Sequence, residues 1–133
     1  MEIRVREERG RVPVSVMHVV GNIDSSTYEA FQAKAEELMK GGARRLLIDL
    51  EEVPLVTSAG LRALNSIFTR LRELTPDVTD EEMRNGINAG TYKSPHLKLL
   101  KPSKASAIAL DHSGFSMFLE TFTDLRSAIE SFS

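Results

Sequence analysis

The chain has 133 residues, a net charge of −2 and no cysteine, with 41% hydrophobic and 27% charged residues. This length and balance predict one globular domain of ordinary soluble composition. The charge offers no basic field for nucleic acid or anionic lipid, and the missing cysteines exclude disulfides, thiolate metal sites and a cysteine nucleophile. The charged N-terminus is unlike a signal peptide and no apolar run reaches membrane-spanning length, so we expect a cytoplasmic protein without membrane insertion.

Two strands are predicted at the start of the chain. Ile3 and Val5 alternate with charged residues, which indicates a half-buried edge strand that could pair with a second copy in a homodimer. Residues 12–20 are rich in β-formers, and Pro13 must lie at the start or edge of that strand. The two faces of the second strand carry Val12, Val14, Val16, His18 and Val20 on one side, and Pro13, Ser15, Met17 and Val19 on the other.

A helix is predicted next, followed by a central strand. Ser26 and Glu29 have the spacing of a capping box at the helix start, and Gly41-Gly42 supply its end. The continuous apolar run at 46–50 is typical of a strand covered on both faces. The apolar positions of the helix follow helical spacing at Tyr28, Phe31, Ala35 and Leu38.

The clearest amphipathic helix begins around Thr57-Ser58 and ends before Pro76. The polar segment at about 76–95 follows, with little periodicity, and Thr79 to Glu82 could cap one short helical turn. This segment is long for a plain connection, so we interpret it as a functional or mobile insert.

The last third of the chain completes an alternating pattern. A strand is predicted at 96–100, a helix at 103–110, an extended segment at 117–122 and a last helix capped by Thr123. The order is therefore β-β-α-β-α-(insert)-β-α-β-α. Strands alternating with helices predict an α/β fold with a mixed, mainly parallel sheet and helices packed on it.

Two motifs in this order resemble the STAS family, which joins sulfate transporters and anti-sigma factor antagonists. The first is the turn Gly21-Asn22-Ile23-Asp24, and the second runs through residues 47–62 as LIDLEEVPLVTSAGLR. The chain departs from the family pattern at Thr57, where aspartate is common, and in the long insert. The resemblance implies a single STAS domain over residues 1–133 with an insert at about 76–95. The matching positions are Gly21, Ile23, Asp24, Leu50, Val53, Ser58, Gly60 and Leu61.

The resemblance to the anti-sigma factor antagonist branch also implies a function. There, the serine aligned with Ser58 is phosphorylated by a partner that is both anti-sigma factor and serine kinase, and a phosphatase reverses the modification. We therefore expect phosphorylation at Ser58, with Thr57 as the less favoured acceptor. A helix start suits the added negative charge, and we expect Ala59 and Gly60 to leave the approach open to a kinase. The resemblance implies partner binding by Gly21, Asn22, Asp24, Thr57, Ser58, Ala59 and Gly60. Arg62 lies one helical turn from Ser58, so it could contact the partner too or belong only to a solvated helix face.

Alternatives remain open for these residues and for the protein. Ser58 or Thr57 could serve simply as a helix N-cap, and Asp24 could serve only to start a helix. The protein could instead be a stand-alone STAS sensory, ligand-binding or scaffold module beside a transporter or signalling complex, with the insert as a lid or assembly contact. Phosphate-loop, dinucleotide and nucleophile-elbow motifs are absent, so we expect no enzyme activity, no catalytic residue and no cofactor. The three histidines show no metal-ligand spacing, so we expect no metal.

Overall fold

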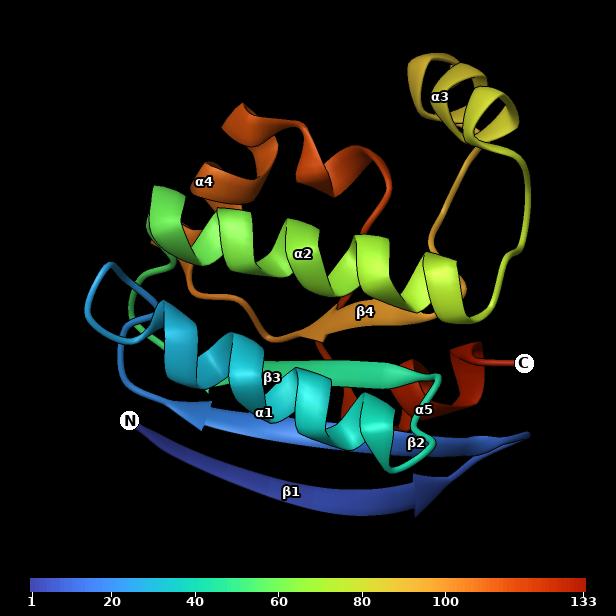
Figure 1. Ribbon diagram of the computed structural model, residues 1–133. Helices are drawn as coiled ribbons and strands as arrows, with labels where there is room; N and C mark the ends of the chain where they lie inside the picture. Colours follow the sequence, from blue (N-terminus) through green and yellow to red (C-terminus); the bar gives the residue numbers. More distant parts are fainter.

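The computed structural model describes residues 1–133 and contains one five-stranded sheet with helices on both faces (Figure 1). The strand order across the sheet is the order along the chain. β1 and β2 are antiparallel, whereas every other neighbouring pair is parallel. The predicted mixed, mainly parallel α/β fold is confirmed, and β1 is an edge strand as expected. The strands are β1 (Glu2–Arg9), β2 (Pro13–Val20), β3 (Leu46–Glu52), β4 (Leu97–Leu100) and β5 (Thr121–Phe122).

The helices divide unevenly between the two faces of the sheet. α1 and α2 lie side by side on one face with α4 next to α2, while α5 lies on the opposite face (Figure 1). The larger apolar core lies under α1 and α2, and a smaller core lies under α5. The helices of the two layers are α1 (Tyr28–Lys40), α2 (Ser58–Leu74), α4 (Lys104–Ser113) and α5 (Leu125–Ser131), with a short 3-10 helix η1 (Phe115–Met117) after α4.

Strand β2 is buried on both faces, and its residues alternate between the two faces as predicted. Met17 and Val19 belong to the large core, whereas Val14 and Val16 belong to the small core under α5. Pro13 is the first residue of the strand and is exposed, where its missing N–H costs no ladder hydrogen bond.

Two predicted helix caps are wrong. The Ser26–Glu29 capping box does not form, because Ser26 gives both its N–H and its hydroxyl to the Asp24 carboxylate and α1 begins two residues later. At the last helix, the side chain of Asp124 and not Thr123 accepts the N–H of Ser127 at 2.8 Å. A carboxylate is the stronger acceptor in both places.

The segment expected to hold one short helical turn forms the ten-residue helix α3 (Asp80–Ala89). A full capping box starts it: Thr79 Oγ1 accepts the N–H of Glu82 at 3.1 Å, and Glu82 Oε1 accepts the N–H of Thr79 at 3.2 Å. α3 lies apart from the sheet, beyond the C-terminal half of α2 (Figure 1). It buries no residue completely, and its apolar residues Met83 and Ile87 pack against the core while only partly buried.

The expected extended segment at 117–122 is shorter than predicted. Only Thr121–Phe122 form a strand, because the preceding residues turn through η1. Phe115 and Phe118 pack against each other there, with ring centroids 5.4 Å apart. This aromatic contact draws the chain back toward the core under α4 and leaves few residues for β5.

Candidate functional site

The two motif segments lie beside each other, just beyond the carboxyl ends of β2 and β3. Ile23 and Val56 form an isolated parallel β-bridge between them. The N–H of Ile23 donates to the carbonyl of Leu55, and the N–H of Thr57 donates to the carbonyl of Ile23, each at 3.0 Å. The chain order β2-loop-α1 and β3-loop-α2 thus produces one continuous surface from two loops whose contacting residues are 33 positions apart, as expected at the carboxyl edge of a parallel pair.

The first loop is fixed by its own residues and by β3. Gly21 has φ +101°, a left-handed conformation that favours glycine, and its N–H donates to the carbonyl of Glu52 at 2.9 Å. Asn22 turns its Oδ1 to the N–H of Leu55 at 3.1 Å. Each bond crosses from the first motif to the second, so neither loop can shift alone.

Gly60 has a packing role that the sequence prediction missed. It is buried, and a Cβ built on it would lie 2.5 Å from the Ile23 carbonyl oxygen and 2.8 Å from Val56 Cγ1. Only glycine lets the first turn of α2 approach the Ile23 strand bridge this closely. The expectation that Ala59 and Gly60 leave an open approach is wrong, because both are buried beneath the surface.

Ser58 is the first residue of α2 and is exposed. Thr57 occupies the N-cap position, but its hydroxyl donates to the Ile23 carbonyl at 3.3 Å and no side chain caps the helix. The interpretation of Ser58 or Thr57 as a capping side chain is therefore wrong. The first turn also lacks an acidic residue. An uncapped helix start of this kind favours a negative group near Ser58.

Asp24 is tied into the first loop. Its Oδ1 accepts the hydroxyl of Ser26 at 2.7 Å and the N–H of Ser26 at 2.9 Å. The hydroxyl bond from Ser26, followed by the backbone bond, holds the pKa of Asp24 below its ordinary value. The N–H of Asp24 in turn donates to Thr27 Oγ1 at 3.0 Å. Asp24 thus fixes the turn before α1 but does not start the helix, because Thr27 is the N-cap residue and α1 begins at Tyr28. Its carboxylate stays charged beside Ile23.

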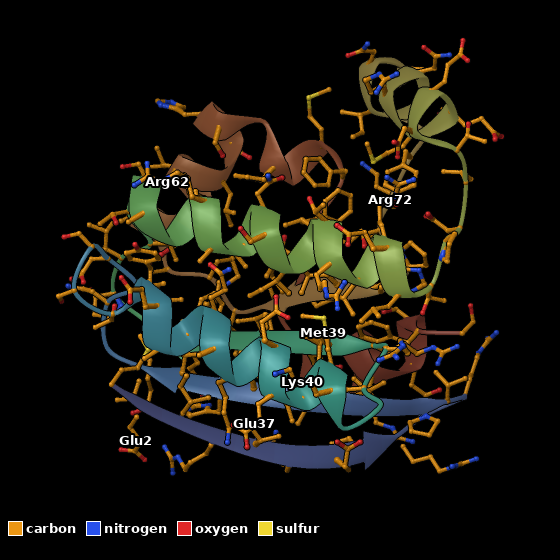
Figure 2. The ribbon with its side chains drawn as sticks, in the orientation of Figure 1. Glu2, Glu37, Met39, Lys40, Arg62 and Arg72 are labelled. Carbon is orange, nitrogen blue, oxygen red and sulfur yellow. The ribbon has the colours of Figure 1, made fainter.

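Three further residues shape this surface, and the sequence prediction missed two of them. Leu55 is an apolar residue 38% exposed, next to the strand bridge. Ser103, before α4, donates its hydroxyl to the carbonyl of Pro54 at 2.7 Å and so holds the second loop from behind. An apolar residue after a loop proline was the available sequence signal for Leu55, whereas nothing in the sequence links Ser103 to Pro54. Arg62, which was predicted, is exposed at the N-terminal end of α2 (Figure 2).

The structure holds no group of three His, Cys, Asp or Glu side chains that could bind a metal ion. None of its helices combines the length and the apolar character needed to cross a membrane. The features of the site are therefore an exposed hydroxyl, a fixed carboxylate, an arginine and one apolar side chain on a rigid backbone frame. Such a surface suits protein binding better than chemistry on a small substrate.

The family model described as the STAS domain matches residues 4–78, more than half of the chain, and both motif loops lie within that match. The chain therefore belongs to the STAS domain family. No curated protein sequence matches it.

Solved structures of anti-sigma factor antagonists share the fold over almost the whole chain. One from Mycobacterium paratuberculosis is 20% identical, with a TM-score of 0.68 over 96% of this chain and 92% of that one. The antagonist SpoIIAA in its unphosphorylated form is 15% identical, with a TM-score of 0.69 over 97% and 94%. The Bacillus SpoIIAA in its phosphorylated form is 16% identical, with a TM-score of 0.61 over 96% and 97%. At these identities the likeness shows the fold.

Proposed function

We propose that this STAS protein is an anti-sigma factor antagonist-like regulator, which binds an anti-sigma factor with serine kinase activity and is released by phosphorylation of Ser58. The observation that carries the proposal is the exposed Ser58 at an uncapped helix start, beside the cross-linked Gly21–Asp24 loop. The structural neighbours support it, because they are anti-sigma factor antagonists and one of them, SpoIIAA, has a phosphorylated form.

The geometry favours Ser58 over Thr57 as the acceptor. Ser58 is exposed, whereas Thr57 is half-buried with its hydroxyl turned to the carbonyl of Ile23. A phosphate carries about −1.5 to −2 charges and suits the free N–H groups of a helix start. Because Leu64, Ile67 and Leu71 anchor α2 in the core, we expect the backbone to stay in place. The phosphate then acts by repulsion and steric conflict with the partner.

The proposed docking surface keeps six predicted residues and gains Leu55. Leu55 supplies an apolar contact, which typical interfaces place among polar neighbours. In this scheme Gly60 acts through the backbone that it lets approach Ile23, and Ala59 is buried beside it. The scheme needs no catalytic residue, and STAS relatives of the antagonist branch generally act by binding. The surface residues are Gly21, Asn22, Asp24, Leu55, Thr57, Ser58 and Arg62.

The proposal also covers the location, the domain organisation and the oligomeric state of the protein. It places the whole chain, residues 1–133, in the cytoplasm as one STAS domain with α3 as its insert, where a kinase partner and a phosphatase act on it in turn. Homodimer formation through the β1 edge belongs to the same proposal, because β1 leaves one row of backbone groups unpaired.

A second candidate function is a sensory or ligand-binding module. A hollow of about 420 Å³ lies at the opposite end of the sheet from Ser58. No residue of α3 lines it, so the hollow gives no support to a lid role for the insert. Its lining includes Glu7, Ser15, Glu37, Leu38, Arg44 and Arg45.

Partner capture from the protein's own host tests the first function against the second. Wild type and Ser58→Ala should retain a protein with an ATP-binding serine kinase fold, and Ser58→Asp should lose it. Asn65→Asp is the matched control, since Asn65 is exposed on the same helix two turns later and gains the same charge. Equal capture by Ser58→Asp and Asn65→Asp would contradict the proposal and favour the ligand-binding function.

A further inference from the structure

His18 on β2 lies between two carboxylates of β3. Its Nδ1 is 2.8 Å from Asp49 Oδ2, and its Nε2 is 2.5 Å from Glu52 Oε2. The His18 side chain is 12% exposed, Asp49 is also buried, and Glu52 is half exposed. The cluster lies on the sheet face that carries α5, in a hollow lined by Arg4, Arg6, His18 and Glu52.

A β-bulge in β3 creates this arrangement. His18 is paired with Asp49, and Val20 with Glu52, so β3 has one residue more than β2 between the two pairs. In a regular strand, residues three positions apart point to opposite faces. The extra residue turns Asp49 and Glu52 to the same face. The N–H of Glu51 donates to Asp49 Oδ1 at 3.1 Å and holds the bulge.

The proton count at His18 follows from these contacts. A neutral imidazole donates from one nitrogen, and only the imidazolium donates from both. Two carboxylate acceptors therefore require a doubly protonated ring. The hydrogen bond that His18 donates to Asp49 is the main cause that raises the pKa of His18, with help from Glu52, against burial and the Arg4 charge. Arg4 and Arg6 face the cluster from β1, and Arg4 also contacts Glu52 at 3.3 Å.

The bulge in β3 is bonded directly to the first loop of the docking surface. The carbonyl of Glu52 accepts the N–H of Gly21 at 2.9 Å, which is where the first loop leaves β2. We infer that His18 is a positioning residue: its imidazolium holds Glu52, and through Glu52 the Gly21–Asp24 loop, in the geometry that the partner meets. Loss of one ring proton releases Glu52, the more exposed carboxylate, and loosens the loop. The statement that a partner meets this loop rests on the proposed function. The hold of His18 on Glu52 and the Gly21–Asp24 loop, here called the clamp, does not.

The clamp is testable on the free protein by NMR between pH 6 and 9. Wild type should show both His18 ring nitrogens protonated at pH 6.5. Exchange of the Gly21 amide, corrected for intrinsic pH dependence, should accelerate as His18 loses a proton. Glu52→Gln should lower the His18 pKa and speed Gly21 exchange by about tenfold, the worth of one charge-assisted hydrogen bond.

Glu51→Gln is the matched control, because Glu51 is an exposed neighbour that pairs with Lys101 at 3.0 Å. It should leave both Gly21 exchange and the His18 titration unchanged. A singly protonated His18 at pH 6.5, or equal Gly21 exchange in the two variants, would overturn the inference. Neither result depends on Ser58 or on a partner, so failure of the clamp and failure of the proposed function are distinguishable.

Discussion

The side-chain Oδ1 of Asn22 accepts the backbone N–H of Leu55 at 3.1 Å, although the two residues are 33 positions apart in sequence. This bond joins the loop after β2 to the loop after β3. It accompanies the Ile23–Val56 bridge and sets the place of the first loop relative to Ser58. The docking surface is thus a cross-linked frame, and its shape depends on residues that need no contact with a partner.

Removal of the Asn22 side chain tests this frame. Asn22→Ala should lower the free energy of unfolding by about 1 kcal/mol, because the N–H of Leu55 loses its partner. The loss in the free energy of partner binding should exceed this loss in the free energy of unfolding. Asn65→Ala, on the exposed face of α2, is the control and should change both little. Urea denaturation measures the free energy of unfolding, and binding titrations measure the affinity for the partner. Equal values for Asn22→Ala and Asn65→Ala would argue against the frame.

Gly60→Ala should be strongly destabilising. The new Cβ would lie 2.5 Å from a backbone oxygen, so α2 or the Ile23 bridge must move, at a cost of about 2 kcal/mol. Gly41→Ala provides the comparison, since its Cβ would meet nothing closer than 3.4 Å and its φ of −79° suits alanine. That variant should stay within about 0.5 kcal/mol of wild type. Similar urea midpoints for the two variants would show that α2 does not need this close approach.

Arg72 lies in the last turn of α2 (Figure 2), and its contacts anchor the start of α3 to that helix. Its guanidinium binds Asp77 at 3.2 Å, Asp80 at 2.9 Å and the Val78 carbonyl at 2.7 Å, with the side chain 11% exposed. Arg72→Ala should therefore lower the unfolding free energy by about 2 kcal/mol. Hydrogen exchange across residues 79–92 should rise at the same time.

Arg70→Ala is the control for that change, because Arg70 is exposed and makes only surface ion pairs with Glu73 and Glu36. Its effect should stay below about 0.5 kcal/mol. Partner capture should survive Arg72→Ala if α3 lies outside the docking surface. Unchanged exchange in residues 79–92 would contradict the anchoring role.

Two histidines should give stability a maximum near pH 6.5. Burial lowers the pKa of His96 in the folded state, and its Nε2 has no hydrogen-bond partner. The unfolded chain takes up a proton at this residue as pH falls through about 6.5, whereas the folded protein does not. The contribution of neutral His96 to the free energy of unfolding is therefore lost in that range. His18 has a raised pKa, chiefly through Asp49, so its contribution is complete below about 6.5 and is lost as pH rises through the folded pKa.

Urea denaturation from pH 5.5 to 8.5 separates the two limbs, because ordinary carboxylates stay ionised there. Glu52→Gln should flatten the alkaline limb and leave the acid limb in place. An alkaline limb of the same size in wild type and Glu52→Gln would exclude His18 as its source.

Local patterns predicted most of the fold. Alternation placed both faces of β2 correctly, and the amphipathic stripe of α2 gave its start and end to within one residue. The errors lie where side chains compete for backbone groups. Asp24 takes the Ser26 groups that a capping box would need, and Asp124 replaces Thr123 as a cap. α3 was underestimated because its sequence is mostly polar, and only Met83 and Ile87 of this helix pack against the core.

The docking surface was predictable as two motifs, but not as a geometry. From the sequence, only the family resemblance predicts that Gly21–Asp24 and Thr57–Gly60 form one surface. The contacts that join them, such as Asn22 to Leu55 and Gly60 against Ile23, depend on tertiary packing. The β3 bulge that brings Asp49 and Glu52 to His18 was hidden for the same reason, since one unpaired residue changes which side chains share a face.

The most direct test of the central claim is the phosphorylation state of Ser58 in protein purified from its own host and mapped by peptide mass spectrometry. We expect a partial phosphate on Ser58, whose fraction changes with growth or stress, and none on the half-buried Thr57. A peptide that contains Ser58, recovered only in its unmodified form across those conditions while a captured kinase partner is active, would contradict this expectation.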